Sequence, residues 1–88
     1  MAWTIELHER AERALRKLDR QTAGRIVRFL ADRVAASDDP RAIGEALSGP
    51  LRGYWRYRVG DYRLVCHIQD SRVTVLVLEI GNRREIYR

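Results

Sequence analysis

The chain has 88 residues, with 17 Lys or Arg against 12 Asp or Glu and a formal net charge of +5. This length predicts a single domain, residues 1–88, with a modest core, and the hydrophobic fraction of 45% excludes a disordered chain. The single cysteine, Cys66, excludes an intrachain disulfide and fits a reducing cytoplasm. No apolar run approaches the ~20 residues needed to cross a bilayer, so a cytoplasmic protein without a membrane partner is expected.

The first half of the chain predicts a short strand followed by two helices. Residues 2–7 alternate weakly, which favours a strand. Between His8 and Leu18 apolar residues recur at helical spacing, and Asp19 can end this helix and cap the next. The second helix should end near residues 37–40, and the two should form an antiparallel hairpin. Its predicted buried face comprises Ala23, Ile26, Val27, Leu30 and Val34.

The second half predicts β-structure. Strands are expected over 54–59 and 62–68, joined by Gly60-Asp61 as a type II′ turn. Residues 73–80 are apolar on both faces, which predicts a central strand that is covered on both sides, and Gly81-Asn82 should end it. The expected fold class is α+β: a short N-terminal strand and a helical hairpin packed on a twisted antiparallel sheet.

Basic residues gather toward the C-terminus. Residues 1–50 carry nine basic and eight acidic side chains, whereas residues 51–88 carry eight arginines and four acids. Lys17 is the only lysine. A GC-rich genome can explain the total of arginine but not its clustering. Because the guanidinium fork grips phosphate oxygens in pairs, this half is the candidate anion-binding region.

Strand pairing predicts where these arginines lie. With a two-residue turn at 60–61, Arg58 opposes Arg63, and Arg56 shares their face of the sheet. Opposed arginines repel each other, so the cluster indicates an anionic ligand between them. Two alternatives remain: an acid neutralises the cluster, or the side chains extend into water. The candidate acids are Asp61, Asp70 and Glu85.

The opposite face and the tail complete this pattern. Trp55 and Cys66 fall on the hydrophobic face and are interpreted as core residues, whereas His8 and His67 are interpreted as surface positions. The tail adds further basic and aromatic residues, namely Arg83, Arg84, Tyr87 and Arg88. A basic cleft beside an aromatic ring is a common device for binding single-stranded nucleic acid.

Three stretches of the chain are similar to the RelE family of type II toxin–antitoxin systems, in the RelE/ParE superfamily. They are Leu47-Ser48-Gly49 leading into Leu51, the block WRYRVGDYRLV from Trp55, and the segment from Val77 that ends in GNRREIYR. The N-terminal helix segment also fits, so the resemblance spans nearly the whole chain.

The resemblance implies a RelE-like toxin domain that acts as a ribosome-dependent mRNA endoribonuclease and inhibits translation. It implies a RelB-like antitoxin, the ribosome and mRNA as partners, with operator DNA contacted only through the toxin–antitoxin complex. No cofactor and no metal are expected. By position, the implied catalytic residues are Arg56, Arg58, Arg63, Arg83 and Tyr87, and Arg84 and Arg88 would bind RNA.

One departure bears on activity. Relatives often carry His where this chain has Asn82, and Asn cannot transfer a proton near neutral pH as His can. If that position takes part in catalysis, the enzyme is expected to be slower or attenuated. The alternatives are a ParE-like toxin that poisons DNA gyrase and a non-catalytic module whose arginines only bind the RNA backbone.

Overall fold

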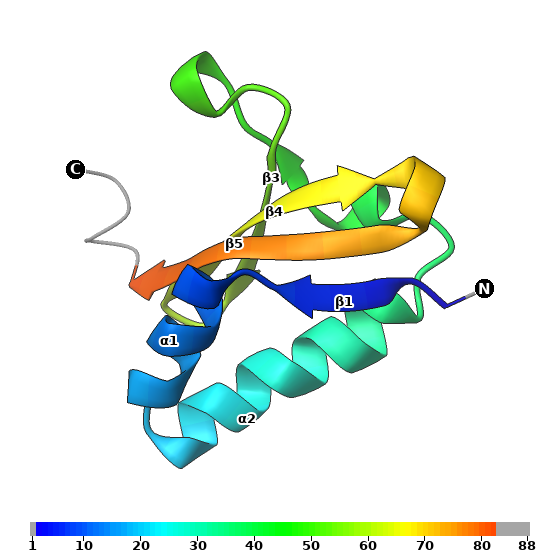
Figure 1. The fold of residues 1–88 in the computed structure, drawn as a ribbon. Helices are drawn as coiled ribbons and strands as arrows, with labels where there is room; N and C mark the ends of the chain where they lie inside the picture. The colour runs from blue at the N-terminus through cyan, green and yellow to red at the C-terminus, as the bar shows by residue number, and fades with distance from the viewer. Residues whose placement is uncertain (1, 83–88) are drawn as a thin grey trace.

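The computed structural model describes residues 2–82, which form a five-stranded sheet with helices packed on one face (Figure 1). The strand order is β1-β5-β4-β3-β2. The main elements are β1 (Thr4–Leu7), α1 (Glu9–Lys17), α2 (Arg20–Phe29), β2 (Glu45–Ala46), β3 (Trp55–Val59), β4 (Tyr62–Gln69) and β5 (Thr74–Asn82). The shorter helical segments are the π-helical turn Leu30–Ala35, which extends α2, and the 3-10 turns Pro40–Ile43, Gly49–Leu51 and Asp70–Arg72. The α+β class is confirmed.

The predicted meander is present as β3, β4 and β5, which pair antiparallel. Gly60 has a φ of 60° at the β3–β4 turn, as the first central residue of a type II′ turn requires. The sheet as a whole is mixed rather than antiparallel, because β1 pairs parallel to β5. Gly81-Asn82 does not end the last strand, since Asn82 still pairs with Tyr62.

Side-chain caps begin both helices. The His8 Nδ1 atom accepts a hydrogen bond of 3.1 Å from the backbone N–H of Arg10 at the start of α1. The Asp19 carboxylate accepts one of 3.0 Å from Thr22 N–H at the start of α2, which confirms the predicted cap. Hydrogen bonds from Thr22, first from its side chain and then from its backbone N–H, hold the pKa of Asp19 below its ordinary value.

The predicted buried face of the second helix is wrong at one position. Ile26, Leu30 and Val34 are buried, but Val27 is 49% exposed. With 3.6 residues per turn, Val27 points about 100° away from Ile26. Phe29 packs toward the core in place of Val27. Its ring contacts the Tyr57 ring edge-on, with 5.8 Å between the ring centroids.

The core lies between the helices and the inner sheet face. Tyr57, Leu64 and Cys66 are buried there with Trp55 packed at the margin, as predicted. Burial raises the pKa of the Cys66 thiol to about 12. The outer face of β5 carries no helix, and Leu78 is half-buried there, so the predicted cover on both sides of this strand is only partial.

Candidate functional site

The three sheet arginines occupy one face, as predicted. Arg58 lies directly opposite Arg63 across the β3–β4 pair, and Arg56 lies opposite Val65. Because side chains alternate along a strand, all three fall on the face away from the helices; we call them the arginine face. Arg63 is only 3% exposed, whereas the Arg58 side chain is 56% exposed. The cluster therefore combines a buried guanidinium, that of Arg63, with a solvent-accessible one, that of Arg58.

Two of these arginines line a small hollow at the hairpin end of the sheet. Its volume is about 50 Å³, and its other lining residues come from the turn: Gly60, Asp61 and Tyr62. A charge held beside the buried Arg63 is screened less than one in open solvent. The hollow is therefore the place where the arginine face can hold a small anion.

The acid that balances the cluster is Glu45, which the sequence analysis missed. Its Oε1 accepts a hydrogen bond of 2.8 Å from Arg56 Nη2 and lies 3.9 Å from Arg58 Nε. The hydrogen bond from Arg56 is the main cause of a Glu45 pKa below its ordinary value. The register of β2 places Glu45 directly opposite Arg56 on β3. Only a prediction of this strand pairing could have revealed the ion pair from the sequence.

The acids that the sequence suggested have other surroundings. Asp70 accepts two hydrogen bonds from Arg41, of 2.9 and 2.7 Å, and this pairing lowers its pKa. Asp61 lines the small hollow. Glu85 lies outside the described residues. Asp70, one of the three acids considered in that alternative, is therefore paired with Arg41 and not with the arginine face.

The predicted tail residues Arg83, Arg84, Tyr87 and Arg88 also lie outside the described residues. The last described residue, Asn82, ends β5 opposite Tyr62. The neighbouring residue, Gly81, pairs with Arg63, which in turn pairs with Arg58. The last described residue of β5 thus lies at the end of the sheet that holds the arginine face.

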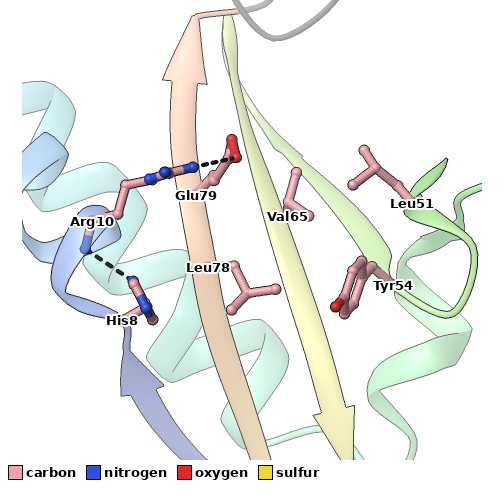
Figure 2. Close-up of a pocket in the computed structure, with 7 residues that line it drawn as sticks. All are labelled: His8, Arg10, Leu51, Tyr54, Val65, Leu78 and Glu79. Atoms are coloured by element: carbon pink, nitrogen blue, oxygen red, sulfur yellow. Dashed lines mark hydrogen bonds and ion pairs between the residues drawn. The ribbon is translucent and has the colours of Figure 1, made fainter.

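A larger groove lies on the same outer face (Figure 2) and was not predicted. Its volume is about 320 Å³, and it is lined by His8, Arg10, Leu51, Tyr54, Val65, Leu78 and Glu79. We call it the sheet groove. His67 lies beside it, with its ring edge-on to Tyr54 at 5.6 Å. Four separate segments build the groove, so no local sequence pattern could reveal it.

Within residues 2–82, no three His, Cys, Asp or Glu side chains gather closely enough to hold a metal ion. No helix in the described part of the chain is both long and apolar enough to span a membrane.

Comparison with known proteins gives consistent results. Residues 5–87 match the family model of the ParE toxin of the type II toxin–antitoxin system parDE. Toxin RelG of Mycobacterium tuberculosis is 33% identical over 88 residues, covering 100% of this chain and 99% of that protein. Toxin RelE of the same organism is 32% identical over 78 residues, covering 89% and 78%.

Solved structures share the fold. The toxin–antitoxin complex RelBE2 of M. tuberculosis matches with a TM-score of 0.85 and 29% identity, over 94% of this chain and 93% of that one. A mutant of E. coli RelE in the free state matches with a TM-score of 0.76 and 27% identity, over 99% and 92%. The chain therefore belongs to the ParE toxin family of type II toxin–antitoxin systems, within the RelE/ParE superfamily.

Proposed function

We propose that this toxin is a metal-independent endoribonuclease that cleaves mRNA on the ribosome and so inhibits translation. The observation that carries the proposal is the juxtaposition of Arg58 and Arg63 beside Arg56 on the sheet face away from the helices. Guanidinium groups bind phosphate oxygens and stabilise the charge that develops on them in a transition state. The similarity to toxins named RelG and RelE supports this reading.

The proposed reaction is transesterification within the RNA strand. The 2′ oxygen bonds to the neighbouring phosphorus, the bond from phosphorus to the 5′ oxygen breaks, and the 2′ proton ends on that 5′ oxygen. Arg58 and Arg63 hold the phosphate, and Arg56 positions the RNA or helps activate the 2′-OH. Arg83 stabilises or protonates the leaving oxygen, and Tyr87 stacks on the nucleotide. Alignment of the reacting atoms supplies much of the rate, since arginine is a weak base.

We also propose a RelB-like antitoxin as the partner. Several structures that share this fold are complexes of a RelE toxin with RelB, from M. tuberculosis, E. coli and Pyrococcus horikoshii. Expression of this chain should arrest growth, and co-expression with a neighbouring reading frame should relieve the arrest. Operator DNA would be contacted only through that complex.

The direct test uses purified toxin with ribosomes carrying a defined mRNA. The expected products are a 2′,3′-cyclic phosphate and a 5′-OH end, and 3′-OH ends would contradict the mechanism. Arg58→Ala should lower the cleavage rate, whereas Arg13→Ala, an equal loss of charge on the exposed face of α1, should not. Arg83→Ala should abolish cleavage and retain ribosome binding; normal cleavage would remove Arg83 from the mechanism.

A second candidate follows from the family model, which is that of ParE toxins. A ParE-like chain would poison DNA gyrase through protein contact instead of cutting RNA. Accumulation of gyrase-cleaved DNA with intact mRNA, unaffected by Arg58→Ala, would favour this candidate over the nuclease.

A further inference from the structure

The shape and lining of the sheet groove suit the binding of a flat ring. Its floor is the buried side chain of Val65, with Leu78 beside it and Tyr54 and Leu51 on one bank (Figure 2). Its volume of about 320 Å³ is near the lower end of the ~300–1,000 Å³ of small-molecule sites. An aromatic ring beside an apolar floor is suited to stacking on a nucleobase.

The opposite bank carries a donor and an acceptor. Arg10 Nη1 donates to Glu79 Oε2 over 3.3 Å, and Figure 2 shows this pair reaching across β5. Both side chains are substantially exposed, at 72% and 40%, so the pair can open toward a ligand. Arginine only donates hydrogen bonds, and an ionised glutamate only accepts them.

The sheet groove is continuous with the arginine face. Val65 pairs with Arg56 on one side and with Glu79 on the other. Arg63 lies two residues along β4 on the same face, which is about 7 Å at the rise of a strand. That separation is comparable with the reach from a phosphate to a base of the same RNA strand. A strand whose phosphate lies on the arginine face can therefore reach Val65 with one of its bases.

We propose that the sheet groove binds a guanine base of the RNA strand held by the arginine face, and that Arg10 and Glu79 select it. Guanine presents two adjacent N–H donors, at N1 and N2, to the two oxygens of one carboxylate. It also presents O6 and N7 as acceptors for a guanidinium. The other three bases do not offer two adjacent N–H groups of this kind, so Glu79 sets the preference. This inference rests on the proposed function, because it names the base that accompanies the bound phosphate.

The first test measures nucleotide binding without cleavage. Titration of the isotope-labelled full chain with guanosine monophosphate should shift the NMR signals of Tyr54, Val65 and Leu78. Uridine monophosphate should shift them less. Tyr54→Ala should weaken the guanosine monophosphate affinity several-fold, whereas Tyr54→Phe, which keeps the ring, should not. Thermal melting of each variant checks that the fold is retained.

The second test measures base preference on ribosomes that carry mRNAs differing at one nucleotide. Glu79→Gln exchanges one acceptor oxygen for a donor, so the preference for guanine at one position should fall about tenfold. Glu9→Gln is the matched control, because Glu9 is an exposed partner of Arg13 on α1 and does not line the groove.

The outcomes separate this inference from the proposed function. Guanosine monophosphate bound in the groove without RNA cleavage keeps the inference and removes the nuclease. Cleavage with a base preference that Glu79→Gln and Tyr54→Ala leave unchanged keeps the nuclease and overturns the inference. Equal shifts with all four nucleotides would also overturn it, as would groove variants that weaken only antitoxin binding, which would assign the groove to the antitoxin.

Discussion

Glu45 controls how much of the positive charge on the arginine face is available to a ligand. Its carboxylate is bonded to Arg56 and lies within 4 Å of Arg58, so an incoming phosphate must compete with it. Glu45→Gln should therefore raise the affinity for a short single-stranded RNA several-fold at low salt, as fluorescence anisotropy would measure. Glu9→Gln, with the same change in net charge, is the control. Equal gains from both variants would mean that only the total charge matters.

The buried hydroxyl of Tyr57 fastens the segment before β2 to the sheet. It donates a 2.7 Å hydrogen bond to the carbonyl oxygen of Pro40. Tyr57→Phe removes the donor and leaves that buried carbonyl without it, so the free energy of unfolding should fall by about 1–2 kcal/mol. Urea denaturation measures this loss, and an unchanged midpoint would show that water replaces the bond.

Because of Tyr57, the free energy of unfolding should also fall at alkaline pH. Burial is the main cause that raises the Tyr57 pKa above its ordinary value. The folded state therefore keeps the phenol proton, and its contribution is fully present below pH ~10, the pKa of an exposed phenol. Above that pH the unfolded state ionises first, so the contribution declines as pH rises. The stability gap between wild type and Tyr57→Phe should narrow above pH ~10.

Residue-scale prediction from sequence worked where the pattern is local. Alternation in the hairpin was enough to place Arg58 opposite Arg63. The partnership of Glu45 with Arg56 was missed because it depends on β2, a strand of two residues whose sequence looks like a helical turn. A pair so short is formed by tertiary contact rather than by β-propensity.

At the scale of elements, the β4–β5 connection contains a strained residue. Val73 has φ 49° and ψ 48°, the left-handed conformation, after the turn Asp70–Arg72. For a β-branched residue this costs on the order of 1–3 kcal/mol. The side chain is 37% exposed, so removing it sacrifices little burial.

Val73→Gly should therefore stabilise the protein. The greater freedom of glycine in the unfolded chain offsets part of the gain, which leaves an increase of about 1 kcal/mol in the free energy of unfolding. Val73→Ala keeps the Cβ and should gain less, which makes it the control for loss of side-chain bulk. A glycine variant that melts below wild type would show that the connection carries no strain.

Two features of the elements could not be read from the sequence. The π-helical turn Leu30–Ala35 changes the phase of α2, and a regular helical repeat does not anticipate that change. The parallel pairing of β1 with β5 joins the two ends of the described chain. Pairing between strands so far apart in the sequence leaves no local sequence pattern. The meander was predictable because each of its turns is short.

At the scale of the whole molecule, the two faces of the sheet have separate tasks. The helices cover the inner face and form the core with it (Figure 1). The arginine face and the sheet groove share the outer face. Side chains on a paired sheet are held more precisely than those on loops. The core can therefore fix the spacing between Arg58, Arg63 and Glu79 while none of these three side chains belongs to it.

A small core of this kind should gain much of its stability from a partner. The described residues expose several large apolar side chains, namely Val27, Ile43, Leu51 and Val73, and a chain of this length buries a limited fraction of its surface. A ligand that binds only the folded state adds about 2.7 kcal/mol at 100 times its dissociation constant. For a domain of 60–100 residues that corresponds to a rise in melting temperature of roughly 10–20 °C.

The cognate antitoxin should therefore raise the melting temperature of the toxin by that amount, and differential scanning calorimetry of the toxin with increasing antitoxin would measure it. An antitoxin from an unrelated toxin–antitoxin pair, added at the same concentration, is the control. The rise should grow with the logarithm of antitoxin concentration, because the stabilisation follows mass action. An antitoxin that relieves growth arrest but leaves the melting temperature unchanged would show that it acts without binding the folded toxin.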